Sequence, residues 1–184
     1  SYVVDPIFFA GGNIGDLAVN GTVNDLAMSG ARPLALSVGL ILEEGLKLEE
    51  LREILQSMKL AADKAGVKIV TGDTKVVPRG KGDKIFINTS GIGVFDHEFR
   101  LAGNSAKPGD KVLINGSIGD HGMAVLASRE GLELQSGIET DSAPLNTMVA
   151  KLLAVHGAAI HVLRDPTRGG VATTLKEIAL QSGI

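Results

Sequence analysis

The alternation of strand-like and helix-like segments in the first half constrains the fold of this chain more than any other feature. Residues 34–42 ("LALSVGLIL") form a nearly continuous apolar run, which predicts a buried strand. The segment 46–66 has the apolar spacing of an amphipathic helix and ends at Gly66. The runs "VKIVTGD" and "DKIFINTSGIGVF" predict two further strands. This order of elements predicts an α/β (α+β) protein.

The remaining segments predict a second module behind a linker. The chain opens with "SYVV", which predicts a strand, and residues 14–31 have helical spacing, with Asn13 as a candidate N-cap. "NSAKPGDKV" (104–112) has the Pro-Gly punctuation of a boundary, and "VLING" then begins a new strand. Three further helices and a strand at "AIHVLRD" follow. We therefore predict modules at 1–103 and 109–184, the second of them incomplete.

Composition excludes several classes of function. Hydrophobic residues make up 44% of the 184, which indicates a folded chain. No apolar run approaches the roughly 20 residues of a membrane span, and there is no secretory signal, so we expect a soluble, cytoplasmic protein. The net charge of −3 comes without a basic stripe, which argues against nucleic-acid binding. The absence of cysteine excludes disulfides, thiolate zinc sites and a cysteine nucleophile within these residues.

The first of three polar segments interrupts the helix predicted over residues 14–31. Asn20, Asn24 and Asp25 lie among apolar residues, where burial without hydrogen-bonding partners would cost several kcal/mol. A spacing of four places Asn20 and Asn24 on one face of the helix. Two interpretations stay open, a solvated polar edge and a functional face.

The second segment is "TGDTK" (71–75), which follows the predicted strand "VKIV". Asp73, Thr74 and Lys75 supply an acid, a hydroxyl and an ammonium, a set suited to a metal-bound phosphate. Ligands in α/β sheets favour the carboxyl ends of strands. An ordinary hairpin turn, with Asp and Thr capping their own backbone, is the alternative.

The third segment, "LRDPTRGGV" (163–171), runs from a predicted strand into a helix. Amides at the helix N-terminus attract phosphate, Arg168 adds a candidate bidentate contact, and Asp165 is a candidate Mg²⁺ ligand. The alternative is a turn in which Arg and Asp pair. Neither the P-loop pattern nor the dinucleotide fingerprint occurs in the chain.

Taken together in chain order, these motifs resemble the HypE family of hydrogenase maturation proteins. That family belongs to the superfamily shared with aminoimidazole ribonucleotide synthetase and selenophosphate synthetase. The segments that carry the resemblance are "DPIFFAGGNIGDLAVNGTVNDLAMSGARP", "GLILEEGL", "IVTGDTKVVPRGKGDKIFINTSGIG", "GDHG" and "LRDPTRGGV". The resemblance implies an ATP-dependent dehydration. A carbamoyl group, carried as a thiocarboxamide on a C-terminal cysteine, becomes the thiocyanate that supplies the cyanide ligands of NiFe hydrogenase.

The resemblance also implies roles for particular residues. Lys75 and Asp73 are the implied catalytic residues, Lys75 to orient or deprotonate the carboxamide. Asp25 and Asp165 are the implied Mg²⁺ ligands. The implied ATP-binding residues are Asn24, Asp25, Thr74, Thr167, Arg168, Gly169 and Gly170.

Assembly and partners are implied by the same resemblance. The family dimerises through first-module strands that build a joint β-barrel, and residues 85–95 are the expected contributor here. The carbamoyltransferase HypF and the HypC–HypD complex are the implied partners. The family's Gly-rich N-terminal segment and cysteine-bearing tail are absent from the 184 residues, so we expect a fragment that binds nucleotide but does not complete the reaction alone.

Other members of the superfamily fit less well. A selenophosphate synthetase needs a reactive Cys or selenocysteine upstream. The purine-pathway synthetase is expected to carry Gly-Gly-Glu-Thr where this chain has Gly72-Asp73-Thr74. A dimerising scaffold without turnover is the non-enzymatic alternative.

Overall fold

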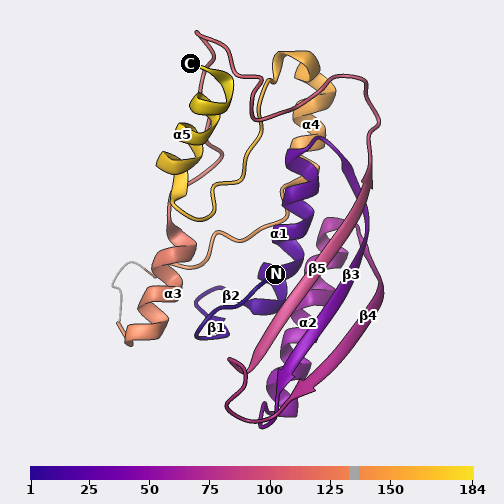
Figure 1. Ribbon diagram of the computed structural model, residues 1–184, viewed down its shortest axis with the longest axis vertical. Coiled ribbons are helices and arrows are strands. Elements are labelled where there is room, and N and C mark those ends of the chain that lie inside the picture. The colour runs from indigo at the N-terminus through magenta and orange to yellow at the C-terminus, as the bar shows by residue number, and fades with distance from the viewer. Residues whose placement is uncertain (133–136) are drawn as a thin grey trace.

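Strand β3, Arg32–Glu43, lies at the centre of a three-stranded sheet in a computed structural model that describes residues 1–132 and 137–184. Strand β4, Lys68–Val77, pairs with it in parallel, and β5, Ile85–Val94, pairs with it antiparallel on the other side. A parallel pair needs a crossover, which helix α2, Leu48–Ala65, supplies between β3 and β4. The predicted strand–helix–strand order of the first module is confirmed (Figure 1).

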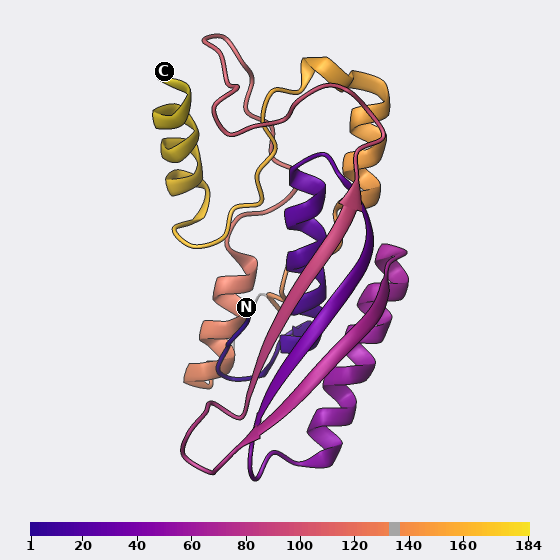
Figure 2. The same cartoon turned by 45° about the vertical axis from the view of Figure 1, so that its right-hand side comes forward.

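Helix α1, Ile14–Met28, and α2 both lie on one face of this sheet, and the other face is open (Figures 1 and 2). Asn13 caps α1, because its side chain accepts from the Gly15 amide while Asp16 accepts from the Asn13 amide. This reciprocal arrangement is a capping box. Helix α2 ends at Gly66 in the left-handed conformation, at φ +69°. A short hairpin, β1 Phe8–Phe9 and β2 Gly12–Asn13, precedes α1.

The main hydrophobic core fills the space between these two helices and the sheet. Its largest fully buried side chains are Ile14, Val19, Val23, Leu36, Ile54, Ile85 and Ile87. Complete burial of such a side chain is worth about 1.5–3 kcal/mol. Gly15 permits the close crossing of α1 over α2, since a Cβ there would lie 2.5 Å from the Ile54 carbonyl oxygen.

The second half consists of three α-helices and a 3₁₀ turn among long connecting segments. These are α3, Asp120–Glu130; α4, Asn146–His156; η1, Gly157–Ala159; and α5, Gly170–Ser182. Helix α4 packs on the C-terminal part of α1, where Ala27, Val149 and Leu153 form a small second cluster. Helix α5 lies above α3 in the view of Figure 1, away from the sheet.

Three predicted strands are wrong. "SYVV" makes a single antiparallel bridge, Tyr2 with Ile87, and "VLING" and "AIHVLRD" pair with no strand in the described residues. A strand requires a hydrogen-bonded neighbour as well as an apolar pattern, and Leu113 in "VLING" is instead 90% exposed. The described part of 109–184 therefore holds helices and no sheet. Residues 133–136, which fall within that predicted module, lie outside the described residues.

The position predicted for "TGDTK" is also corrected. The segment is neither a hairpin turn nor a loop beyond a strand, because β4 runs on through Val77. Asp73, Thr74 and Lys75 therefore lie inside an edge strand.

No helix within the described residues is both long enough and apolar enough to span a membrane.

Candidate functional site

Asp25 and Asp165, 140 positions apart in the sequence, lie within electrostatic range of each other. Asp25 is near the C-terminal end of α1, and Asp165 is in the segment that leads into α5. Burial raises the pKa of Asp165, and the negative charge of Asp25 raises that pKa further. Burial also raises the pKa of Asp25, against smaller lowering by the positive charges of the Ser1 amino group and Arg164. Two partly desolvated carboxylates that repel each other favour a cation between them.

The donor chemistry of this pair fits Mg²⁺. That ion takes oxygen ligands and keeps several waters, so one or two carboxylates with phosphate oxygens suffice. No group of three or more metal-ligating acidic or histidine side chains occurs in residues 1–132 and 137–184. The pair is therefore a weak site for a cation alone and a better one for a cation that arrives with its phosphates.

The turn after Asp165 places backbone amides next to the carboxylate pair. Gly169 and Gly170 have φ values of +80° and +64°, a region that favours glycine, and α5 begins at Gly170. The first amides of a helix have no partner within the helix. Thr167 and Arg168 are exposed in this turn. The predicted turn into a helix is therefore present, and its binding of phosphate stays a prediction.

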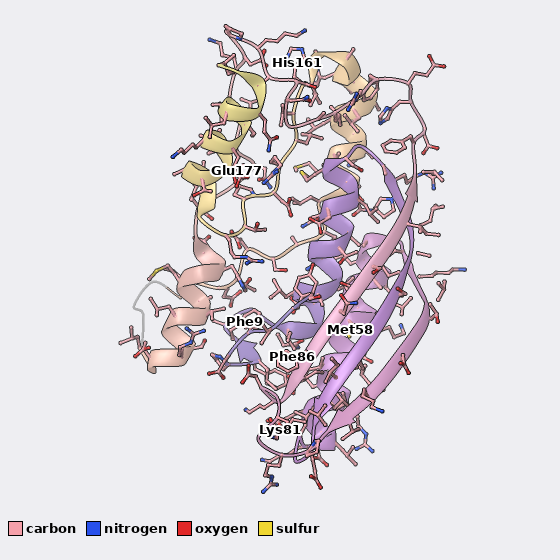
Figure 3. The ribbon with its side chains drawn as sticks, in the orientation of Figure 1. Phe9, Met58, Lys81, Phe86, His161 and Glu177 are labelled. Atoms are coloured by element: carbon pink, nitrogen blue, oxygen red, sulfur yellow. The ribbon has the colours of Figure 1, made fainter. Side chains whose placement is uncertain are left out.

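An ion pair fixes the start of this segment to α5. The Arg164 guanidinium donates to Glu177 at 2.9 Å, and Glu177 lies on the helix that follows the turn (Figure 3). The ion pair directs the Arg164 guanidinium toward α5, and Asp165 is the next residue in the chain. Arg164 is thus a cation beside the site that the sequence motifs did not single out.

Asn20 and Asn24 hold a distant segment against α1. Asn20 Nδ2 donates to Ser142 Oγ at 3.0 Å; Asn24 Nδ2 donates to the Ala143 carbonyl at 3.0 Å and Asn24 Oδ1 accepts from the Leu145 amide at 2.8 Å. Asn20 is only 4% exposed. The interpretation as a solvated polar edge is therefore wrong for this pair. Asn24, predicted to bind cofactor, uses both ends of its amide on the backbone of the chain.

The three residues predicted in "GDTK" divide between the two faces of the sheet. In the parallel register, Asp73 and Lys75 pair with Gly39 and Ile41, while Thr74 pairs with Leu40. Paired residues point to the same side, and Leu40 packs into the helix-covered core. Thr74 therefore faces a groove of about 520 Å³ between β4 and α2, whereas Lys75 faces the open side. The register places the Asp73 side chain on the open side as well, although Asp73 also borders the groove.

Within one chain, the segments do not all converge. Strand β3 lies between β4 and β5, and α1 packs mainly over β5. Asp73 and Lys75 are thus separated from the Asp25–Asp165 pair by the sheet itself. The structure brings the first and third polar segments together and leaves the second on the opposite face.

The sequence motifs did not single out Tyr2, whose side chain contacts α1, the helix that carries Asp25. Tyr2 reaches α1 beside Gly21, where a Cβ would overlap the phenolic oxygen. A glycine inside a helix costs about 1 kcal/mol relative to alanine. An unexplained glycine in the middle of a helix was the available signal that another group approaches there.

A further contact joins the first hairpin to α3. The ring of Phe9 packs edge-on against His121, with 5.2 Å between ring centroids, and Phe9 lies on β1 (Figure 3). His121 Nδ1 also lies 2.9 Å from Thr140 Oγ1. His121 therefore links α3 to the β1–β2 hairpin and to Thr140. Thr140 lies in the segment whose Ser142 contacts Asn20.

Models of two known protein domains match the two parts of this chain. The family model described as AIR synthase related protein, N-terminal domain, matches residues 1–95, and the model for the C-terminal domain matches residues 107–184. The chain belongs to the AIR synthase related family. A carbamoyl dehydratase HypE of Rhizobium leguminosarum bv. viciae is 56% identical over 183 residues, which cover 100% of this chain and 52% of that protein.

Solved structures agree with these sequence matches. A crystal structure of a HypE–HypF complex gives a TM-score of 0.96 at 57% identity, covering 99% of this chain and 59% of the other. HypE in complex with ATP gives 0.96 at 60% identity, covering 98% of this chain and 54% of the other. The resemblance to HypE proteins that the motifs indicated is confirmed. The chain spans about half the length of the curated relatives it matches.

Proposed function

We propose that this chain forms the nucleotide-phosphate site of an ATP-dependent carbamoyl dehydratase of the HypE type, active in NiFe hydrogenase maturation. The observation that carries the proposal is that Asp25 and Asp165 lie within electrostatic range of each other, and that the turn at Gly169 and Gly170 follows Asp165 in the chain. Supporting it are relatives named carbamoyl dehydratase HypE and a related HypE that was crystallised with ATP.

In this proposal, the residues near the turn bind the triphosphate. Asp25 and Asp165 hold Mg²⁺, which neutralises charge on the transferring phosphoryl group. The Gly169 amide, with Thr167 and Arg168, faces phosphate oxygens. The Gly170 amide donates to the Thr167 carbonyl at 3.0 Å, so its own contact with phosphate requires that bond to open. Asn24 acts through its hold on residues 143–145, which fixes the neighbouring Asp25.

The chemistry balances as a dehydration driven by ATP. The γ-phosphoryl group moves to the carboxamide oxygen, ADP leaves, and loss of phosphate with two N–H protons leaves the thiocyanate carbon bound to nitrogen by a triple bond. Lys75 and Asp73, which share the open face of β4, are suited to orient the carboxamide and accept those protons. Thr74 faces the other side, so its contact with phosphate requires an approach along the groove against α2.

The separation of Asp73 and Lys75 from Asp25 favours a site completed by two chains. Strand β4 is an unpaired edge whose residues are exposed on both faces, Ile69, Val70 and Val76 included. Such an edge is a template for pairing with another chain. The proposal is a homodimer in which first-module strands build a β-barrel. Residues 85–95 contribute Ile92 and Phe95, which are 66% and 63% exposed.

The modules and partners complete the proposal. Residues 1–103 form the dimerisation and ATP-binding module, and 109–184 form the first half of a synthetase-like module. HypF is the proposed donor of the carbamoyl group, supported by the crystallised complex of a related HypE with HypF. The HypC–HypD complex is the proposed acceptor of the product.

The test is a calorimetric titration of the folded 184-residue chain with ATP, with and without Mg²⁺. We expect Mg²⁺-dependent binding that Asp25→Asn removes. The matched control is Asp83→Asn, a change in an exposed loop outside the site, which leaves binding intact. Absence of ATP binding by the folded chain, or equal effects of the two substitutions, contradicts the proposed site.

A further inference from the structure

Tyr2 is fixed beside the sheet by its backbone. Its amide donates to the Ile87 carbonyl at 2.7 Å, and the Ile87 amide donates back to the Tyr2 carbonyl at 3.1 Å. The ring packs against the main core, and the hydroxyl reaches over β5 to α1 at Gly21. The position of the phenolic oxygen is therefore set by the fold and not by a flexible loop.

A chain of hydroxyl groups decides which way the Tyr2 proton points. Tyr2 Oη lies 3.4 Å from Thr22 Oγ1, which lies 2.6 Å from Thr89 Oγ1, and Thr89 donates to the Ala18 carbonyl at 3.2 Å. A carbonyl only accepts and each hydroxyl has one proton. All three contacts are made at once only when Tyr2 donates to Thr22, Thr22 donates to Thr89 and Thr89 donates to Ala18.

The phenol lies near Asp25, because Gly21, where the phenolic oxygen meets α1, precedes Asp25 by four residues on that helix. Burial raises the pKa of the Tyr2 hydroxyl; the hydrogen bond with Thr22 lowers that pKa, and the charges of Asp25 and Asp165 raise it. A phenol near carboxylates ordinarily donates its proton to one of them. Here the proton is committed to Thr22, so the oxygen is left as a hydrogen-bond acceptor.

We propose that Tyr2 is a positioning residue of the Asp25–Asp165 site, with its phenolic oxygen accepting a hydrogen bond from a water bound to the cation. This rests on the proposed function. Mg²⁺ keeps several waters when it binds proteins, and each water proton needs an acceptor. The Thr22–Thr89 relay keeps the Tyr2 proton away from the carboxylates, so that they stay available to the cation.

The chain offers a direct optical probe of this arrangement. Tyr2 is its one tyrosine and it has no tryptophan. Luminescence of Tb³⁺ sensitised by tyrosine therefore reports an ion near Tyr2. We expect sensitised emission from the 184-residue chain that Mg²⁺ competes away and that Asp25→Asn or Asp165→Asn abolishes.

Affinity for Mn²⁺, measured without nucleotide by calorimetry, tests the role of the oxygen. Loss of one hydrogen bond corresponds to roughly a threefold to tenfold change in affinity. We expect that weakening from Tyr2→Phe and a similar one from Thr22→Val, which frees the phenol proton to turn toward the carboxylates. In the Tyr2→Phe background, Thr22→Val has no further effect on affinity. Ile87→Val, which trims the core beside the same backbone bridge, is the matched control and leaves affinity unchanged.

The outcomes separate the two proposals. Wild-type affinity in a folded Tyr2→Phe variant, with loss of affinity in Asp25→Asn, overturns the role of Tyr2 and leaves the proposed site standing. Affinity that neither aspartate substitution changes, or no Mn²⁺ binding by the folded chain, overturns both. Equal weakening by Ile87→Val assigns the effect of Tyr2 to general destabilisation and overturns its positioning role.

Discussion

The two halves of this chain are held in place in different ways. Residues 7–87 enclose one continuous core between α1, α2 and the sheet, with five side chains at 0% or 1% exposure among Ile14, Leu36, Ile54, Ile85 and Ile87. Among the described residues from 107 onward, Val149 and Leu153 are the buried members of a small cluster that also contains Ala27 of α1, with Leu145, Ile160 and Leu163 packed against it. Long apolar side chains there remain exposed, Leu113 and Val155 among them.

This difference teaches that the second half is ordered mainly by directional contacts to the first. Asn20 and Asn24 hold residues 142–145, and Asn146 donates to the Ala65 carbonyl at the end of α2 at 2.8 Å. The candidate carboxylate pair has one member in each half. Its geometry therefore depends on a few hydrogen bonds together with the small cluster of Ala27, Val149 and Leu153.

The largest expected effect tests the core of the first half. Ile54→Ala removes a fully buried side chain of the main core, and we expect a loss of about 4 kcal/mol in the free energy of unfolding. Leu153→Ala is the counterpart in the second half, and we expect under half of that loss. Chemical denaturation measures both. Equal losses would break the comparison, because they would show that the second half shares the same cooperative core.

An intermediate effect is expected at the hydrogen bonds between the halves. Asn24→Ala leaves the Ala143 carbonyl and the Leu145 amide without this partner, at a cost of about 2 kcal/mol. Hydrogen exchange should accelerate over residues 142–156 and stay unchanged over β5. The exposed Asn104→Ala is the control and alters neither region. Acceleration spread evenly over both regions would contradict the distinction.

The smallest effect concerns the carboxylate pair and has a definite sign. Because burial raises the pKa of Asp165 above its unfolded value, the stability that its proton confers is present at low pH and is lost as the pH rises through the folded pKa. Asp165→Asn should therefore stabilise the chain modestly at neutral pH, and the gain should vanish below the unfolded pKa of about 3.9. Thermal unfolding at both pH values measures it. Destabilisation at neutral pH would show that the carboxylate is favourably paired.

Sequence patterns predicted what depends on neighbours in the chain. Asn13 predicted the start of α1 and Gly66 predicted the end of α2. The apolar run 34–42 predicted β3. The strands predicted at "VLING" and "AIHVLRD" failed because pairing depends on a distant partner that periodicity does not reveal. The same limit applies to Tyr2, whose approach to Gly21 joins residues that only the folded sheet brings together.

The candidate site divides in the same manner. The roles of Asp25 and Asp165 came from resemblance and stay predictions; the structure shows that the two carboxylates lie within electrostatic range of each other. The ligand role of Asn24 also came from resemblance. The polar residue in an apolar helix indicated only that it needs a partner, and the sequence could not show that the partner is the backbone at residues 143–145. Asp73 and Lys75 lie on the opposite face from Thr74 because the strand continues through Val77. The Gly-Asp pair in the sequence indicated a turn instead, so this alternation was not predicted.

The position of β3 in the sheet has a consequence for how the chain is made. Its register with β5 runs from Arg32 with Val94 to Leu42 with Ile85, and its other partner begins only at Lys68. During synthesis, the central strand is complete long before either neighbour exists, since both pairings close over α2. The pair α1–α2, linked by close packing at Gly15, is thus the structure available to cover that strand while the ribosome adds the rest. Growth of the sheet then proceeds outward from its middle, with the antiparallel edge added last.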